Sequence, residues 1–474
     1  MQKILTKKLQ LLEIYTKKRI KVGAEMATVE KEIERFLSGL KKINPHQPNF
    51  HHAANELVTP IMPWYLDHKK YQDAQILERL TEPDRIISFR VSWEKDNGEV
   101  AVNRGWRVQF CNAIGPYKGG LRFHPTVNED ILKFLGFEQV FKNSLTGLPM
   151  GGAKGGSNFD PKGKSDNEVM RFCQSFMIEL HRYIGEDIDV PAGDIGVGPR
   201  EISNLFGQYT RLANRWAGVM TGKGCSFGGS SVRVEATGFG CIYFCEHVLQ
   251  ELDQSLEGKK ICISGSGNVA LYAAEKAMAK KANVITMSDS DGFIYAKDGI
   301  ANEQLEFIID LKEKKRGRIS EAAEKFDEID FHKESKPWGV VCDIAMPCAT
   351  QNEIDEKDAE TLVKNNIMIV CEGANMPTTP AAAKILCNSN ITHIPSKASN
   401  AGGVAVSGFE QSQNALRMGW SKEKVDEELQ AIMKNIHNKC LLYGKDKDRI
   451  DYVKGANTAG FKKVADTLLA YGVI

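Results

Sequence analysis

The sequence predicts an α/β protein with two domains, the second of which holds a doubly wound, mostly parallel sheet. Its 474 residues, of which 42% are hydrophobic, are enough for at least two hydrophobic cores. Strand-like and helix-like patterns mix from the start, and from about residue 229 short apolar segments alternate with stretches of helical length. We therefore expect one domain over 26–228 and another over 229–450, with 451–474 packing back onto the first.

The first domain is predicted to combine helices with strands. The expected helices span 30–58, 126–145 and 165–183, and the expected strands span 86–91 and 106–112. Two of these helices begin at a capping box, Thr126-x-x-Glu129 and Ser165-x-x-Glu168, in which side-chain oxygens satisfy free backbone N–H groups. Pro199 is suited to the first position of a further helix.

Five short segments rich in Val, Ile or Cys predict a parallel sheet in the second domain, because strands covered on both faces are apolar throughout. They lie at 260–264, 284–288, 340–345, 367–371 and 392–395. The helix-length stretches between them complete a doubly wound α/β pattern. A highly charged stretch at 306–326 is expected to form a solvated helix.

A glycine-rich turn joins the first of these strands to a helical pattern. Gly265-Ser266-Gly267-Asn268-Val269-Ala270 follows KKICIS and precedes VALYAAEKAMAKK. Gly265 permits a tight turn, Gly267 lets the backbone approach a pyrophosphate, and the helix N-terminus attracts its negative charge. The turn therefore predicts a Rossmann-like dinucleotide-binding domain, with Ser266, Asn268 and Val269 also at the cofactor.

The residues alone leave the choice between NAD and NADP open. Asp289 ends the second strand, where a carboxylate can accept hydrogen bonds from a ribose 2′-hydroxyl, which favours NAD. Ser290 follows it, and the basic cluster from Lys312 to Arg318 can supply cationic partners to a 2′-phosphate, which favours NADP.

Three lysines of the first domain lie in apolar or glycine-rich segments, namely Lys118 in PYKGG, Lys142 in FEQVFKNSL and Lys154 in MGGAKGG. Gln139 lies three residues before Lys142 and so shares a helix face with it. A converging set of lysines would bind a dianionic acid, and one member would have a depressed pKa. Asp194, in a glycine-rich loop after a strand pattern, can carry protons beside such a lysine or organise its own turn.

The overall composition indicates a small-molecule ligand. Sixty-two basic and 61 acidic residues give a formal charge of +1, so neither nucleic acid nor a membrane is expected as a partner. Eleven cysteines without a Cys-x-x-Cys pair suit a reducing compartment such as the cytoplasm, and Cys241, Cys245 and His247 lack the spacing of a metal site. The lysine-rich residues 1–25 are expected to be a solvated extension, with organelle targeting as the alternative.

These segments together resemble the hexameric glutamate dehydrogenases, particularly the small type of bacteria and lower eukaryotes. The matching blocks follow in order over roughly 26–474 and include PYKGGLRFHP, LGFEQVFKNSLTGLPMGGAKGG, DVPAGDIGVGPRE, EATGFG, SGSGNVA, CEGANMPTT and NAGGVAVSGFEQSQNA. The resemblance implies reversible oxidative deamination of L-glutamate to 2-oxoglutarate and ammonium. It also implies NADP in preference to NAD, no metal, and a homohexamer.

The resemblance further implies which residues hold the substrate. Lys118 and Ser407 would hold the distal carboxylate, and Lys142, with Gln139 and Gly120 nearby, would hold the α-carboxylate. Ser407-x-x-Glu410 is also a possible capping box, in which the hydroxyl would serve its own helix.

Catalytic and cofactor contacts follow in the same way. Lys154 would assist the attack of water on the imine carbon, and Asp194 would pass protons to and from the nitrogen. Thr237 and Asn375 would face the nicotinamide, and Asn400 would line the same cleft. The alternatives are an NAD-dependent glutamate dehydrogenase, a related dehydrogenase for an apolar amino acid, and a non-catalytic binding protein.

Overall fold

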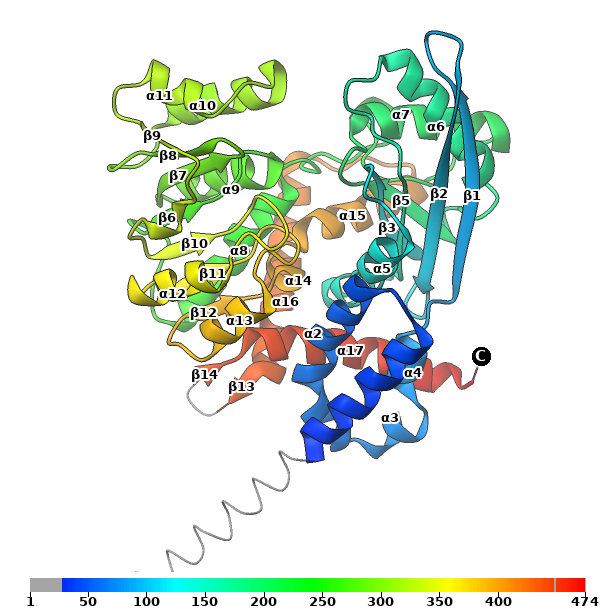
Figure 1. Cartoon of the computed structure of the whole chain (residues 1–474), viewed down its shortest axis with the longest axis horizontal. Coiled ribbons are helices and arrows are strands. Elements are labelled where there is room, and N and C mark those ends of the chain that lie inside the picture. Colours follow the sequence, from blue (N-terminus) through cyan, green and yellow to red (C-terminus); the bar gives the residue numbers. More distant parts are fainter. Residues whose placement is uncertain (1–27, 447–448, 474) are drawn as a thin grey trace, which may run out of the picture.

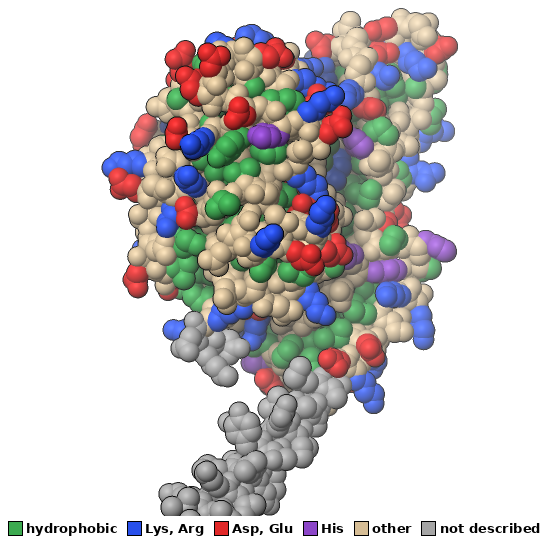
Figure 2. All heavy atoms as spheres, turned by 60° about the vertical axis from the view of Figure 1, so that its left-hand side comes forward, with side chains coloured by type: hydrophobic (Ala, Val, Ile, Leu, Met, Phe, Trp, Pro, Cys, Tyr) green, Lys and Arg blue, Asp and Glu red, His purple; other side chains and the backbone are tan. Residues whose placement is uncertain are grey.

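A computed structural model describes residues 28–446 and 449–473 (Figure 1). The chain forms two α/β units, each built on its own sheet, which confirms the predicted fold class. The N-terminal extension expected over 1–25 lies outside the described residues. Among the described residues, no helix is long and apolar enough to cross a membrane. On the face seen in Figure 2, basic and acidic side chains are interspersed.

The first unit holds a five-stranded sheet in the order β1-β2-β4-β3-β5. The strands are β1 (Arg85–Glu94), β2 (Val100–Cys111), β3 (Tyr117–Phe123), β4 (Gly152–Ser157) and β5 (Asp189–Gly193). Strands β3, β4 and β5 run parallel, so the carboxyl ends of these strands meet at one edge. Helix α5 (Glu129–Thr146) covers one face, and α6 (Asp166–Leu180) and α7 (Pro199–Ala213) cover the other.

Two local predictions in this unit are wrong. The helix expected over 30–58 is two helices, 28–43 and α2 (Pro48–Leu66), separated by a break in which His46 has a φ of 65°. Helix α5 is capped by Asn128, whose side chain accepts a hydrogen bond from the Ile131 N–H, and not by Thr126. The Ser165–Glu168 capping box is confirmed at α6. Short helices α3 (Lys69–Asp73) and α4 (Ile76–Leu80) lead into β1.

The second unit holds a seven-stranded sheet in the order β12-β11-β10-β6-β7-β8-β9. Its parallel strands are β6 (Lys260–Ile263), β7 (Asn283–Asp289), β10 (Ile344–Met346), β11 (Ile369–Cys371) and β12 (Thr392–Ile394). Helices α8 (Ala236–Glu251) and α9 (Asn268–Ala279) pack on one face, and α12 (Glu356–Lys364) and α13 (Pro380–Cys387) pack on the other. This is the predicted doubly wound arrangement.

The structure corrects three expectations in the second unit. An antiparallel hairpin, β8 (Gly292–Tyr295) and β9 (Asp330–Lys333), extends the sheet beyond the expected strands. The charged stretch expected as one helix over 306–326 is instead α10 (Asn302–Asp310), a π-helical turn (Leu311–Lys315) and α11 (Ser320–Lys325). The segment before β10 is also a loop rather than a strand as far as residue 343.

The last helices connect the two units. They are α14 (Ser396–Ser399), α15 (Gly402–Leu416), α16 (Lys422–Gly444) and α17 (Tyr452–Tyr471), with a short ladder of β13 (Lys445–Asp446) and β14 (Arg449–Ile450) before α17. Helix α17 packs on α2 and α5 of the first unit, where Phe461 joins the core with Phe50. Lys223 and Glu410 form a fully buried ion pair of 2.7 Å between the end of the first unit and α15. The exact domain boundaries stay a prediction.

Candidate active site

A cleft with a volume of about 1240 Å³ lies between the two units, lined by residues along β3, β4 and β5 of the first unit and by the turns that follow β6, β10 and β11 of the second. All but three of the predicted site residues line it, and the exceptions are Gly265, Asp289 and Ser290. The lining residues among them are Lys118, Gly120, Gln139, Lys142, Lys154, Asp194, Thr237, Ser266, Gly267, Asn268, Val269, Asn375, Asn400 and Ser407. The fold therefore brings together segments that are up to 289 residues apart, from Lys118 to Ser407.

Lys154 and Asp194 form the centre of the cleft. Lys154 on β4 is 4% exposed, and its Nζ lies 2.8 Å from Oδ1 of Asp194, just beyond β5. Arg122 on β3 donates from Nε to Oδ2 of the same carboxylate at 2.6 Å. Burial alone would raise the pKa of Asp194, but the charges of Lys154 and Arg122 outweigh burial and hold this pKa well below its usual range. Asp194 is therefore an anion held between two cations.

The pKa of Lys154 is lowered, as expected for a member of a converging cationic set. Burial is the largest cause, and the charge of Asp194 partly opposes it, while Arg122 lowers the pKa further. Arg122 was not among the predicted site residues, although it lies in the segment PYKGGLRFHP. Arg122 lies two residues after Gly120 on a strand and therefore on the same face. This spacing could have indicated that Arg122 belongs to the site.

Lys118, on β3, lines the cleft away from this central pair and is 1% exposed. Its Nζ donates to Oγ1 of Thr221 at 2.8 Å. Burial lowers the pKa of Lys118 well below its ordinary value, and the nearby cations Arg233 and Arg107 lower it further. Among the described residues no carboxylate forms an ion pair with Lys118, and a ligand with a negative charge would supply one.

Ser407 faces the same end of the cleft. It lies inside α15, not at its start, so the alternative that Ser407 caps its own helix is wrong. Its Oγ accepts a hydrogen bond of 3.1 Å from Nε of Arg233, a partly buried residue that was not predicted either. Arg233 lies in a turn before α8, where no periodic pattern distinguishes it.

A buried ion pair stabilises the strands that carry Lys118 and Lys154. Arg107 on β2 and Asp189 at the start of β5 are both fully buried and pair through two hydrogen bonds, one of them 2.9 Å long. Arg107 also donates to the carbonyl oxygen of Gly119 at 3.0 Å, and Gln109 donates to Asp189 at 2.9 Å. This network fixes the strands that carry Lys118 and Lys154.

Lys142 on α5 crosses the cleft. Its Nζ donates to Oδ1 of Asn375 at 3.3 Å, and the same oxygen accepts a hydrogen bond of 3.0 Å from Nδ2 of Asn400. Burial lowers the pKa of Lys142 to about 8, the charge of Lys154 adds to this, and Glu138 opposes it. Gln139 lies beside Lys142 on the cleft and donates to Asn143 at 2.6 Å.

The glycine-rich turn has the geometry that a dinucleotide requires. Gly265 has a φ of +85°, and a Cβ there would come within 3.0 Å of Ala349 and Cys348 backbone atoms. Gly267 precedes α9 and faces open space, and among the described residues no side chain caps this helix. The free N–H groups of the first turn are therefore available to a phosphate.

A buried acceptor marks the opposite end of the predicted cofactor site. Asn400 is 3% exposed, and within the described residues its Oδ1 has no hydrogen-bond partner. It lines the cleft with Thr237 of α8 and with Asn375. An unsatisfied buried acceptor suits a ligand that carries an amide N–H group, as a nicotinamide does.

Asp289 is engaged by its own chain. Its carboxylate accepts hydrogen bonds from the backbone N–H of Ile319 at 2.9 Å and of Asp291 at 3.0 Å, and from Nζ of Lys312 at 3.3 Å. Arg318 donates to Oγ of Ser290 at 2.7 Å. The basic cluster therefore faces the end of β7, and direct contacts from Asp289 or Ser290 to a cofactor stay predictions.

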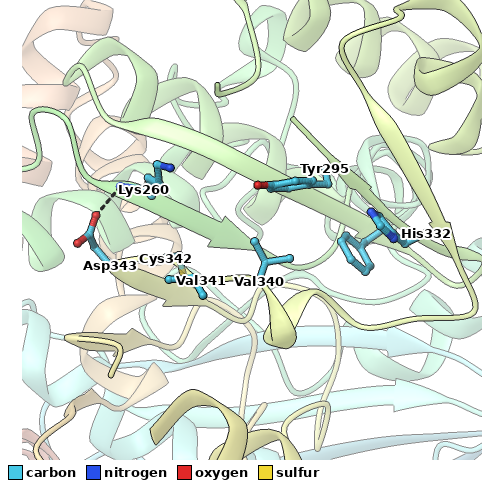
Figure 3. A pocket seen from close by; sticks show the side chains of 8 residues that line it. Lys260, Tyr295, His332, Val340, Val341, Cys342 and Asp343 are labelled. Carbon is cyan, nitrogen blue, oxygen red and sulfur yellow. Dashed lines mark hydrogen bonds between the residues drawn. The ribbon is translucent and has the colours of Figure 1, made fainter. Parts of the chain in front are cut away.

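A second hollow of about 480 Å³ lies at the amino ends of β6 and β10 (Figure 3). Its lining includes Tyr295, His332 and Val341, and Asp343 accepts a hydrogen bond from the backbone N–H of Lys260 at 2.8 Å. None of the predicted site residues lies there. Among the described residues, no group of three His, Cys, Asp or Glu side chains is placed to hold a metal ion.

Comparisons with known proteins match the chain to a family of dehydrogenases. A family model described as Glutamate/Leucine/Phenylalanine/Valine dehydrogenase matches residues 228–472, and the dimerisation domain of the same family matches 83–211. The chain is 56% identical to an NAD(P)-specific glutamate dehydrogenase of Xylanibacter ruminicola, over 92% of this chain and 98% of that protein. It is 52% identical to the NADP-specific glutamate dehydrogenase of Escherichia coli, over 93% and 99%. A crystal structure of Plasmodium falciparum glutamate dehydrogenase covers 95% of this chain and 96% of its own, with 50% identity and a TM-score of 0.92.

Proposed function

The chain belongs to the glutamate/leucine/phenylalanine/valine dehydrogenase family, and we propose that it is an NADP-dependent glutamate dehydrogenase. The reaction is the reversible oxidative deamination of L-glutamate to 2-oxoglutarate and ammonium. The observation that carries the proposal is the distal end of the cleft, where Lys118, Arg233 and Ser407 meet. A buried cation, a partly buried cation and a hydroxyl suit a carboxylate, whereas an apolar side chain would leave the cations without a partner.

The substrate would lie between Lys118 and Arg233 on one side and Lys142 on the other. Lys118 and Ser407, with Arg233, would hold the distal carboxylate of glutamate. Lys142, together with Gln139 and the backbone at Gly120, would hold the α-carboxylate, for which Lys142 would exchange its hydrogen bond to Asn375. A carboxylate at each end would direct Cα towards Lys154 and the nicotinamide side of the cleft.

Lys154 and Asp194 would manage the protons. When bound, the dinucleotide accepts the hydride from Cα in the oxidative direction. Lys154 would activate the water that attacks the imine carbon and stabilise the developing alkoxide, because its lowered pKa makes the ammonium group give up its proton more readily. Asp194 would pass protons to and from the nitrogen, and closure of the cleft would exclude bulk water beforehand.

NADP is the cofactor that fits the end of β7. Asp289 is occupied by Lys312 and by backbone N–H groups, so its charge is compensated. Ser290 and Arg318 lie beside it and can donate to a 2′-phosphate. Thr237, Asn375 and Asn400 would contact the nicotinamide.

We infer the assembly and the location of the protein from its relatives. The dimerisation domain over 83–211 supports a homo-oligomer, and the resemblance to hexameric relatives supports a homohexamer. The bacterial relatives support a cytoplasmic location. The alternative of organelle targeting gains no support from the comparisons, and residues 1–25, on which it depends, are outside the described structure.

Initial rates test the function directly. We expect NADPH oxidation to require both 2-oxoglutarate and ammonium, and to exceed NADH oxidation under the same conditions. L-Glutamate should be oxidised and L-leucine should not. Lys118→Met should lower kcat/KM for glutamate by roughly a hundredfold or more, because the variant leaves a buried carboxylate unpaired. Equal turnover of leucine and glutamate would instead favour the apolar amino-acid dehydrogenase.

A further inference from the structure

Three charged side chains of the cleft come from three adjacent strands of the first unit. Arg122 is on β3, Lys154 is on β4, and Asp194 follows β5 directly. Arg122 is opposite Gly156 of β4, which lies two residues after Lys154. Because side chains alternate along a strand, Arg122 and Lys154 point to the same face of the sheet. The pairing of the strands therefore directs both cations to the carboxylate of Asp194.

The backbone around Asp194 is held against β3. The carbonyl oxygen of Asp194 accepts a hydrogen bond of 2.9 Å from the N–H of Val197, and the N–H of Phe123 donates to the carbonyl oxygen of Ile195 at 2.9 Å. A Cβ at Gly120 would lie 2.9 Å from the Cβ of Asp194, so a side chain at this position of β3 would displace that of Asp194. The loop therefore fixes the place of the carboxylate but leaves its rotation to the partners of its two oxygens.

Each oxygen of the Asp194 carboxylate contacts one cation. Oδ1 accepts a hydrogen bond of 2.8 Å from Nζ of Lys154, and Oδ2 accepts one of 2.6 Å from Nε of Arg122. The side chains of Arg122 and Asp194 are 15% and 17% exposed, so water and salt screen their attraction only weakly. Because a guanidinium does not lose its proton in proteins, Arg122 contributes a fixed charge, whereas Lys154 can exchange a proton.

The charge of Arg122 acts on both of its neighbours in the same direction. Burial alone would raise the pKa of Asp194, but the charges of Lys154 and Arg122 outweigh burial and lower this pKa. Burial lowers the pKa of Lys154 and the charge of Asp194 opposes this, while Arg122 lowers it further. The other charged groups that act on Lys154 or are acted on by it are Arg107 of β2 and Lys142 of α5. Without Arg122, the pKa of Asp194 and the pKa of Lys154 would both rise.

We infer that Arg122 is a positioning residue of the proposed dehydrogenase, which turns the Asp194 carboxylate towards Lys154 and keeps it an anion until the substrate nitrogen arrives. The inference rests on the proposed function, in which Asp194 exchanges protons with that nitrogen. Arg122 exchanges no proton itself. Its charge also favours the release to solvent of a proton that Asp194 has received, because a neutral Asp194 leaves the guanidinium without a charged partner.

The pH dependence of kcat/KM for glutamate oxidation tests this inference in the full-length protein. Above pH 5.5 both carboxylates of glutamate are ionised, so the acid limb of the profile reports groups of the enzyme. Arg122→Gln should move this limb to higher pH by about one unit, whether Asp194 or Lys154 limits the rate there. Arg122→Lys, which keeps the charge, should stay within about 0.3 unit of the wild-type profile. A limb that stays in place in Arg122→Gln, or moves to lower pH, would overturn the inference.

Chemical rescue separates the charge of Arg122 from the space that its side chain fills. Arg122 lines the cleft, so Arg122→Ala leaves a space beside Asp194 that a small solute can enter. Guanidinium at about 50 mM, far below denaturing concentrations, should raise the activity of this variant by roughly tenfold. Urea has a similar planar shape without the charge and should not. Equal recovery with urea, or none with guanidinium, would contradict the inference.

Two controls keep this inference distinct from the proposed function and from a loss of folding. Arg211→Gln removes an exposed arginine of α7, and its pH profile should coincide with that of the wild type. Urea unfolding of Arg122→Gln would show whether the variant is folded; if it is not, Arg122→Lys and the rescue of Arg122→Ala still decide. Absence of glutamate oxidation in the wild type would overturn both proposals, whereas wild-type activity with an unmoved acid limb in Arg122→Gln would overturn only the role of Arg122.

Discussion

The two walls of the cleft present different kinds of chemical group to a ligand. The wall from the first unit presents charged side chains, with Lys118 and Lys154 almost fully buried and Asp194 held between Lys154 and Arg122. The wall from the second unit presents backbone and amide groups, with Gly267 at the start of α9 and Asn375 and Asn400 at the other end. Buried charges suit a charged substrate and proton transfer, whereas N–H groups and amides suit a larger ligand that exchanges no protons with the protein.

This difference predicts where substitutions act. Changes on the charged wall should reduce kcat or abolish binding of the substrate, because an unpaired buried charge is costly. Changes on the wall of the second unit should mainly alter the KM for the cofactor and the stability of the turn. Four substitutions test this contrast, in order of decreasing effect.

Lys154→Ala should have the largest effect. Loss of the proton donor and of the charge beside the reacting carbon should lower kcat by about a thousandfold or more. The KM for NADPH should stay within a few-fold of the wild-type value, because Lys154 belongs to the opposite wall. Lys162→Ala, at an exposed position on the same unit, is the control. Activity of Lys154→Ala close to that of the control would remove Lys154 from the mechanism.

Gly265→Ala should mainly affect stability. A Cβ at this position meets Ala349 and Cys348 at 3.0 Å, and the φ of +85° is unfavourable for alanine, so we expect a loss of about 1–3 kcal/mol in the free energy of unfolding. Gly258→Ala is a matched control, because Gly258 has a φ of +78° and no atom within 4 Å of its Cβ position. Urea unfolding of both variants separates the clash from the backbone strain. An equal loss in both would show that the close approach at Gly265 costs nothing.

Lys142 should make substrate binding depend on pH. Its pKa is lowered to about 8, so the ammonium group is charged below that pH and neutral above it. The inhibition constant of glutarate, a dicarboxylate without an amino group, should therefore rise above pH 8. Lys142→Arg stays charged, so the ratio of the wild-type constant to that of the variant should rise about tenfold per pH unit above the pKa. A constant ratio from pH 7 to pH 10 would show that Lys142 does not contact the carboxylate.

Arg318→Ala should have the smallest effect. Arg318 is 57% exposed, so its charge is screened, and we expect the KM for NADPH to rise by about fivefold. The KM for NADH should not change, because NADH has no 2′-phosphate. Arg316→Ala, two residues earlier and also exposed, is the control. An equal rise in both cofactor constants would place Arg318 away from the phosphate.

The lysines of the charged wall could be predicted from the sequence better than the arginines that contact the site residues. Lys118 and Lys154 were identified because lysines among glycines are unusual, and the structure places both in the cleft. Arg122 and Arg233 were missed because each one acquires its role from a partner distant in sequence, Asp194 for Arg122 and Ser407 for Arg233. Pairing between separate elements is a tertiary property that local periodicity does not contain.

The same distinction holds for the fold. The five parallel strands were predictable, because burial on both faces makes them apolar throughout. The β8–β9 hairpin was not, because it lies at the edge of the sheet and β9 carries Asp330, His332 and Lys333. The π-helical turn at Leu311–Lys315 was also missed, because its basic residues suggested a solvated helix, whereas Lys312 is directed to Asp289 and the carbonyl oxygen of Gly317.

The position of α17 has a consequence for the order of folding. Its residues Phe461, Val464 and Ala465 belong to the same core as Phe50 and Leu57 of α2. During synthesis, the whole of the second unit leaves the ribosome before these three side chains do. Most of the first unit is translated first, but its core is completed last. Until α17 has been translated, the apolar face of α2 lacks the side chains that cover it in the folded protein.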